Sequence, residues 1–160
     1  MRLLMKTALA TLLLDQATKF LVVHLLDLDG RQEISVLPPF LQFRMAWNEG
    51  INFGLLASSG DLGRWVLILL ALAISGWIWR WAGHEPGNRR VQISAGLLIG
   101  GALGNVIDRL FFGAVADFLN MGLPWFDNPF SFNVADVAIF IGALGLVFFS
   151  RQDKAADKTP

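Results

Sequence analysis

The chain has 160 residues, of which 54% are hydrophobic and 16% are charged, and its mean hydropathy is positive. It is too apolar for an ordinary soluble domain of this length, so an integral membrane protein is expected. A formal net charge of zero gives no sign of nucleic acid as a partner, and the absence of cysteine excludes disulfides, thiolate catalysis and cysteine-bound metal sites.

Four apolar stretches are long enough to cross about 30 Å of hydrocarbon at about 1.5 Å per residue. They are residues 3–26, 65–81, 93–112 and 134–149. The first resembles a secretory signal because Arg2 and Lys6 precede it. However, Asp15 and Lys19 interrupt the run and no small-residue cleavage site follows, so a retained helix is expected. Residues 1–160 are interpreted as a single membrane domain.

The orientation follows from basic residues near the ends of the spans, since these favour the cytoplasmic side. Three groups fall on one side if both termini are cytoplasmic: Arg2 and Lys6; Arg80, Arg89 and Arg90; Arg151, Lys154 and Lys158. Residues 27–64 and 113–133 then form the outer segments. Arg31, Arg44 and Arg64 lie on that outer side, so the bias is real but not absolute.

The first outer segment contains a strand-like pattern. Leu41, Phe43 and Met45 alternate with more polar neighbours, which is the period of a half-buried strand. The fold class expected is therefore an all-α membrane protein of four transmembrane helices, with a small extracytoplasmic β-sheet between helices 1 and 2 on the membrane surface. An irregular loop is the alternative for this segment.

The third span carries two stripes of small and polar residues on adjacent faces. The stripes are Gly96, Gly100, Gly104 and Asp108, and beside them Gly101, Asn105 and Arg109. Small residues let another helix approach closely, so the polar residues at the outer end are directed into the bundle. Alternatively, Asp108 and Arg109 only cap the helix.

Asp15 and Lys19 stand four residues apart in the first span, with the acid before the base. Ionisable residues inside a span cost about 2.5–3.5 kcal/mol on insertion scales and usually have a function. An ion pair that supports the polar site is the interpretation favoured here.

Asp117 and Asp136 are predicted at similar depth on the outer side. Each alone has an ordinary explanation, since Asp136 follows Asn133 at a helix start and could serve as an N-terminal cap. If the two carboxyl groups meet, they share a proton, and one can activate water while the other donates to a carbonyl oxygen. This is aspartic-protease chemistry. His24 and His84 are too far apart for a zinc site, so neither metal nor cofactor is expected.

At these residues the chain resembles the bacterial lipoprotein signal peptidases, also called signal peptidase II. The resemblance covers nearly the whole chain, and five blocks in order make it specific. The blocks are Asp15-Gln16-x-Thr18-Lys19, Asn48-x-Gly50-x-x-Phe53-Gly54, Gly100-Gly101-x-x-Gly104-Asn105-x-Ile107-Asp108-Arg109, Val115-x-Asp117-Phe118 and Phe132-Asn133-x-Ala135-Asp136. Asn52 departs from the family, which more often has alanine there.

The resemblance implies an intramembrane aspartic endopeptidase of the bacterial inner membrane, which cuts diacylglyceryl-modified prolipoproteins before the lipidated cysteine. The implied catalytic residues are Asp117 and Asp136. Substrate-binding or supporting roles are implied for Asp15, Lys19, Asn48, Gly50, Asn105, Asp108, Arg109 and Asn133. Sensitivity to the cyclic peptide globomycin, contact with membrane lipid and a monomeric state are further expectations.

Two other classes of protein were weighed against a peptidase. A small proton-coupled transporter could use the same buried carboxylates as a relay, and a non-catalytic assembly subunit could use the polar groups to hold helices together. The polar residues gather at the outer side rather than along a path through the third and fourth spans, which disfavours conduction. Cleavage of a lipidated precursor by the purified protein separates all three.

Overall fold

The computed structural model describes residues 1–50, 61–126 and 128–156, with side chains up to residue 150. The predicted loop features at Asn52, Phe53 and Gly54 lie outside the described residues. The elements in chain order are α1 (Arg2–Lys19), η1 (Phe20–Leu25), α2 (Leu28–Arg31), β1 (Glu33–Leu37), β2 (Leu41–Asn48), α3 (Asp61–Ala82), α4 (Arg89–Phe112), β3 (Val115–Asn120) and α5 (Val134–Ala156).

Within the described part of the chain, three helices are long and apolar enough to cross a membrane. They are Arg2–Leu25, Asp61–Ala82 and Arg89–Phe112, whereas the apolar part of the last helix, Val134–Ser150, is shorter. These helices agree with the first three predicted spans. The second and third begin about one turn earlier than predicted, because polar residues join their first turns; Asn88 caps α4 by accepting a hydrogen bond from Val91 N at 3.1 Å.

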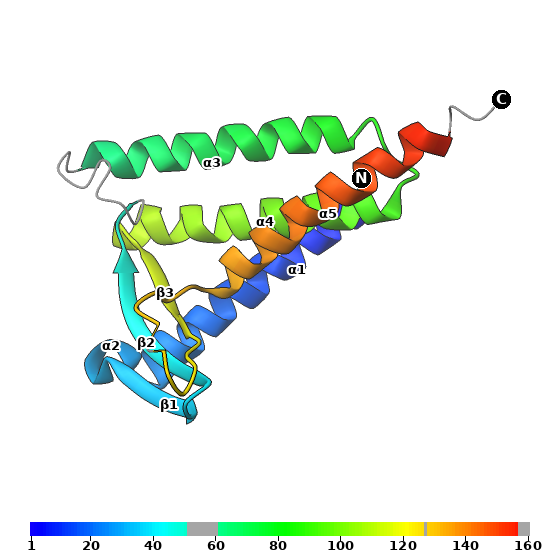
Figure 1. Cartoon of the computed structure of the whole chain (residues 1–160). Helices are drawn as coiled ribbons and strands as arrows, with labels where there is room; N and C mark the ends of the chain where they lie inside the picture. Colours follow the sequence, from blue (N-terminus) through cyan, green and yellow to red (C-terminus); the bar gives the residue numbers. More distant parts are fainter. Residues whose placement is uncertain (51–60, 127, 157–160) are drawn as a thin grey trace.

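Helices α1, α4 and α5 pack closely together, and α3 runs alongside α4 (Figure 1). Glycines on α4 make the close packing possible. A Cβ on Gly100 would lie 2.8 Å from Thr11 Cβ of α1, and one on Gly101 would lie 2.9 Å from Ile139 of α5. The two predicted stripes of α4 therefore face two different helices, and small residues are required on both.

The sheet has three antiparallel strands in the order β1-β2-β3 and lies at one end of the bundle (Figure 1). Ala46 of β2 pairs with Asp117 of β3, and Phe43 pairs with Leu119. The prediction confined the sheet to the segment between helices 1 and 2, which is wrong in extent, because β3 comes from the segment between α4 and α5. Five of the six residues of β3 are buried, so this strand has no alternation of apolar and polar residues to reveal it.

Candidate active site

Asp117 and Asp136 are brought to one site although one lies on a strand and the other on a helix. The side chain of Asn133 joins them: its Nδ2 donates to Asp117 Oδ1 at 2.6 Å, and its Oδ1 accepts from Asp136 N at 2.9 Å. Asn133 itself is fully buried. Sequence spacing alone could not establish this meeting, which depends on the pairing of β3 with Phe132, just before the start of α5.

The carboxyl group of Asp136 is held by two N–H donors. Its Oδ2 accepts from Asn133 N at 3.1 Å, and its Oδ1 accepts from Asn105 Nδ2 at 2.9 Å. Asp136 also lies in the first turn of α5, where the helix dipole favours a negative charge. The residue that caps α5 is Asn133 and not Asp136, as the alternative interpretation of Asp136 had it; Asp136 is the third residue of the helix and binds Asn133 reciprocally.

Asp117 occupies a more enclosed position, with 4% of its surface exposed. Besides the bond from Asn133, its Oδ2 accepts from Asn48 Nδ2 at 3.0 Å. Burial, and after it the charge of Asp136, raise the pKa of Asp117 from 3.8 to about 6, against the two amide hydrogen bonds that lower it. The site therefore holds one carboxyl group that retains its proton well above the usual range for aspartate.

Lys19 forms ion pairs with two other buried aspartates, Asp15 and Asp108. Its Nζ lies 2.9 Å from Asp15 Oδ2 and 2.8 Å from Asp108 Oδ2. The predicted pair of Asp15 and Lys19 is therefore one half of a three-residue cluster, which we call the ion triad. The alternative that Asp108 only caps α4 does not hold, because its carboxylate binds Lys19 of another helix.

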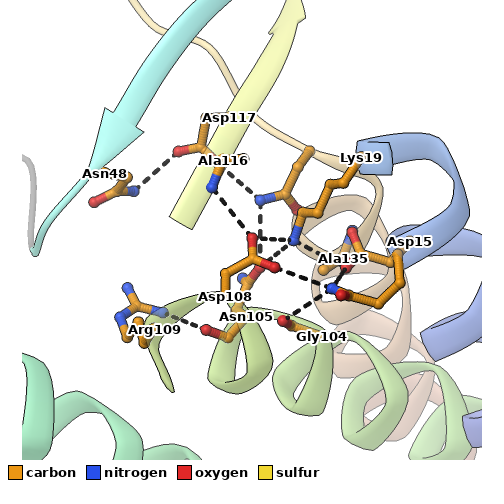
Figure 2. Close-up of polar contacts among 12 residues, drawn as sticks. Asp15, Lys19, Asn48, Gly104, Asn105, Asp108, Arg109, Ala116, Asp117 and Ala135 are labelled. Carbon is orange, nitrogen blue, oxygen red and sulfur yellow. Dashed lines mark hydrogen bonds and ion pairs between the residues drawn. The ribbon is translucent and has the colours of Figure 1, made fainter. Parts of the chain in front are cut away.

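Hydrogen bonds connect the ion triad to the backbone next to Asp117 and next to Asp136. Asp108 Oδ2 accepts a hydrogen bond from Ala116 N at 3.2 Å, and Asp15 Oδ1 accepts one from Ala135 N at 3.0 Å. Ala116 immediately precedes Asp117, and Ala135 immediately precedes Asp136. Figure 2 shows Lys19 between Asp15 and Asp108, with Ala116 and Ala135 on either side. One buried lysine thus fixes the strand and the helix that carry the two carboxyl groups.

Asn105 connects the ion triad to the pair. Its Oδ1 accepts from Lys19 Nζ at 3.2 Å and from Asn133 Nδ2 at 3.3 Å, while its Nδ2 donates to Asp136. Lys19 and Asn133 can only donate to the oxygen of this amide. The amide is therefore oriented with its nitrogen toward the carboxylate of Asp136.

Two other predicted residues, Asn48 and Gly50, come together at the end of β2, where Gly50 N donates to Asn48 Oδ1 at 3.2 Å. This bond orients the Asn48 amide so that its nitrogen faces Asp117. Arg109 lies in the last turn of α4, and its Nη1 donates to Asn105 O at 3.3 Å. Its charge interacts with both Asp117 and Asp136.

Sequence reasoning did not select Gln16 as a site residue, although it stands between Asp15 and Thr18 in the first block of the family resemblance. Its Nε2 donates to Asp15 Oδ2 at 3.1 Å and to Asp108 Oδ1 at 3.0 Å. The sequence could indicate a role for Gln16 in the ion triad only if Asp108 were already known to face Asp15. The described residues contain no group of three or more His, Cys, Asp or Glu able to hold a metal ion.

Comparison with known proteins gives the site its context. The family described as Signal peptidase (SPase) II matches residues 7–151. The chain belongs to the signal peptidase II family. Its relatives include the lipoprotein signal peptidase of Methylobacterium sp. (strain 4-46), which is 42% identical over 88% of this chain and 84% of that protein. The lipoprotein signal peptidase of Aeromonas hydrophila is 40% identical over 96% of this chain and 91% of that protein.

Solved structures agree with the signal peptidase II fold. A bacterial membrane enzyme determined by the in meso method at 2.3 Å resolution aligns with a TM-score of 0.78 and 26% identity, covering 98% of this chain and 92% of that one. A second such enzyme, at 1.9 Å resolution, has a TM-score of 0.76 at 24% identity and supports the fold alone. The chain is therefore a multi-pass membrane protein of a peptidase family, and nothing in these relationships favours the transporter interpretation.

Proposed function

We propose that this chain removes the signal peptide from prolipoproteins as an aspartic endopeptidase, with Asp117 and Asp136 as its catalytic carboxyl groups. The family supports the reaction, since its members here carry the name lipoprotein signal peptidase. The observation that carries the aspartic mechanism is the link through Asn133, whose side chain binds both carboxyl-bearing residues. The raised pKa of Asp117 supports a pair that shares one proton.

The surroundings assign different roles to the two aspartates. Asp136, at the start of α5 with two N–H donors, carries the negative charge and takes a proton from water. Asp117, buried and protonated, donates its proton to the oxygen of the scissile carbonyl as water attacks the carbon. The tetrahedral intermediate then collapses: the proton on Asp136 passes to the leaving nitrogen, and Asp117 regains a proton from the hydroxyl group that becomes the new carboxyl.

Other polar groups of the site are proposed to hold the substrate. Asn48 and Arg109 have donors beside the catalytic pair, and the permanent charge of Arg109 makes it the stronger donor to backbone carbonyls. The resemblance to the family names the substrate as a precursor whose cysteine carries diacylglycerol, cut just before that cysteine. Such a lipid anchor would hold the scissile bond near the membrane surface.

We also propose four membrane passes in the inner membrane, with both termini cytoplasmic and the catalytic pair near the outer face. The start of α1 and the end of α5 lie at the end of the bundle away from the sheet, as four antiparallel passes require (Figure 1). The basic residues Arg80, Arg89 and Arg90 lie at that same end, at the turn between α3 and α4.

The test is mass spectrometry of a diacylglyceryl-prolipoprotein incubated with the purified protein in detergent. Asp117→Asn and Asp136→Asn should each reduce cleavage by several orders of magnitude, because each role requires an ionisable carboxyl group. Asp27→Asn is the matched control, since Asp27 is exposed and its left-handed backbone conformation suits asparagine. Rapid turnover by either variant in folded protein would remove that residue from the catalytic pair. Activity should also survive EDTA.

A further inference from the structure

The side chain of Gln16 reaches from α1 to α4, as that of Lys19 does, and it binds the same two carboxylates. Its Nε2 carries two hydrogens, and its two shortest contacts are with Asp15 Oδ2 at 3.1 Å and Asp108 Oδ1 at 3.0 Å. A longer contact of 3.3 Å joins the same nitrogen to Gly104 O. Gln16 is therefore a second bridge between the two acidic members of the ion triad.

The ion triad needs such a donor because its formal charges do not balance. Asp15 and Asp108 bring two negative charges against the single positive charge of Lys19, and their side chains are 2% or less exposed. A buried ion cluster is stable only when hydrogen bonds satisfy the lone pairs that the ion pairs leave over. The amide of Gln16 donates two such bonds without adding a charge.

The remaining contacts of the two supporting carboxylates lead to the proposed catalytic pair. Asp15 and Asp108 each accept a hydrogen bond from the backbone N–H of an alanine that precedes one of the catalytic aspartates. The direction in which each supporting carboxylate points therefore affects the position of one catalytic carboxyl group. Since a misplacement of about 1 Å can cost roughly a hundredfold in rate, a donor that fixes both supporting carboxylates matters for catalysis through position alone.

We propose that Gln16 is a positioning residue for the peptidase reaction, and that it sets the distance between the carboxyl groups of Asp117 and Asp136. It acts through Asp15 and Asp108 and touches neither the substrate nor the reacting atoms. This inference rests on the proposed function, because the rate that Gln16 affects is that of peptide cleavage. Substitutions of Gln16 should accordingly change kcat and leave KM unaltered.

A cavity of about 110 Å³ lies beside Gln16. Its lining includes Gln16, Lys19, Asp108 and Ala116. The cavity has room for roughly three water molecules, at about 30 Å³ each. A shortened side chain at position 16 would open into this cavity, so that water could take the place of the amide, whereas an apolar side chain of full length would keep water out.

The first experiment compares Gln16→Met with Gln16→Ala on a diacylglyceryl-prolipoprotein, with rates expressed per folded protein from near-UV circular dichroism. Methionine has nearly the length of glutamine but no donor, so Gln16→Met should lower kcat about ten- to a hundredfold, the range for loss of a hydrogen bond to a charged group. Gln16→Ala should lower kcat only about threefold, because bridging water replaces the amide. A role in packing predicts the opposite order, since alanine removes more buried atoms.

The matched control is Gln42→Met. Gln42 is also partly buried, and its amide donates to Asn120 Oδ1 at 3.1 Å, outside the ion triad and the catalytic pair. This substitution removes an equal side chain and one amide hydrogen bond, and it should leave the kcat of the folded protein unchanged.

The second experiment uses the pH profile of kcat/KM, which a loss of packing alone would not move. Without the bridge, the like charges of the two supporting carboxylates separate, and the catalytic carboxyl groups move apart with them. The charge of Asp136 then raises the pKa of Asp117 less, so the fall of kcat/KM on the basic side should occur at lower pH in Gln16→Met. Gln16→Ala should shift the profile in the same direction by a smaller amount, so the test stands if Gln16→Met does not fold. All variants keep Lys19 and Arg109, whose charges also act on Asp117.

The outcomes separate this inference from the function on which it rests. If the unaltered protein cuts no lipidated precursor, the proposed function itself is wrong. If the unaltered protein is active and Gln16→Met loses no more kcat than Gln16→Ala or Gln42→Met, Gln16 is not a positioning residue. A rise in KM at unchanged kcat would place Gln16 in substrate binding instead, and a pH profile that is the same in all variants would also overturn the proposal.

Discussion

At the scale of single residues, the positions of the two proposed catalytic side chains are set by backbone contacts next to them. Asp108 binds the N–H before Asp117, Asp15 binds the N–H before Asp136, and Lys19 holds both of these supporting carboxylates. The two supporting carboxylates have 2% or less of their side chains exposed. Since an unpaired buried charge is far more costly than a paired one, the folded state is expected to depend on Lys19.

Replacement of Lys19 should therefore destabilise the protein strongly. Lys19→Met leaves Asp15 and Asp108 buried without a counter-ion, and we expect a loss of about 3–5 kcal/mol in the free energy of unfolding. The measurement is reversible unfolding in detergent. Lys6→Met, an exposed position on the same helix, is the control and should differ little from the unaltered protein. Equal stability of the two variants would mean that the ion triad contributes nothing to the fold.

The pH dependence follows from Asp117, whose pKa is raised from 3.8 to about 6 by burial and then by the charge of Asp136. As the pH rises through about 6, Asp117 loses the proton that the proposed mechanism requires, so kcat/KM should fall on that side of a bell-shaped profile. Over the same range the free energy of unfolding should fall with rising pH, because the folded protein retains a proton that the unfolded chain has already released. An increase of kcat/KM through pH 6 to a plateau would contradict the role of Asp117 as proton donor.

At the scale of helices and strands, sequence reasoning succeeded where a pattern is local. Long apolar runs gave α1, α3 and α4, and the four-residue spacing of glycines gave the faces of α4 that pack on its neighbours. Strand β3 was missed because it is buried on both sides and pairs with a strand far away in the sequence. The hydrogen bonds from the backbone N–H groups of Ala116 and Ala135 could not be predicted either, because nearly every residue type has such a group.

The glycine faces of α4 offer a test of helix packing. Gly100→Ala should lower the free energy of unfolding by about 1–3 kcal/mol, because its Cβ would meet the backbone of Ala8 and, at 2.8 Å, Thr11 Cβ. Gly76→Ala, on α3 with no atom within 4 Å of the new Cβ, should be neutral or slightly stabilising, since alanine favours helix. Similar losses at both positions would show that close approach of α1 and α4 is not the constraint.

At the scale of the whole molecule, the sheet lies at one end of the bundle, and the start of α1 and the end of α5 lie at the other (Figure 1). If the basic end faces the cytoplasm, substrate cleavage takes place at the outer surface. The family relationship, rather than the charge pattern, links the protein to prolipoprotein substrates.

Labelling of single cysteines tests this orientation, since the chain has none of its own. Arg31→Cys and Met121→Cys, both exposed at the sheet end, should react with an impermeant maleimide added to intact spheroplasts. Gly87→Cys, in the turn between α3 and α4, should react only after the membrane is opened. The reverse pattern would place the proposed catalytic pair on the cytoplasmic side.

The hydrogen bonds to the carboxyl groups of Asp117 and Asp136 come from the amide groups of Asn48, Asn105 and Asn133 and from the backbone N–H of Asn133. These donors are neutral and do not titrate, and they stand in direct contact with the carboxyl oxygens. Mobile ions screen exposed charges at a distance but have little effect on buried groups in contact. The chemical step should accordingly proceed at the same rate in dilute and concentrated salt, so any dependence on ionic strength belongs to the encounter with the substrate.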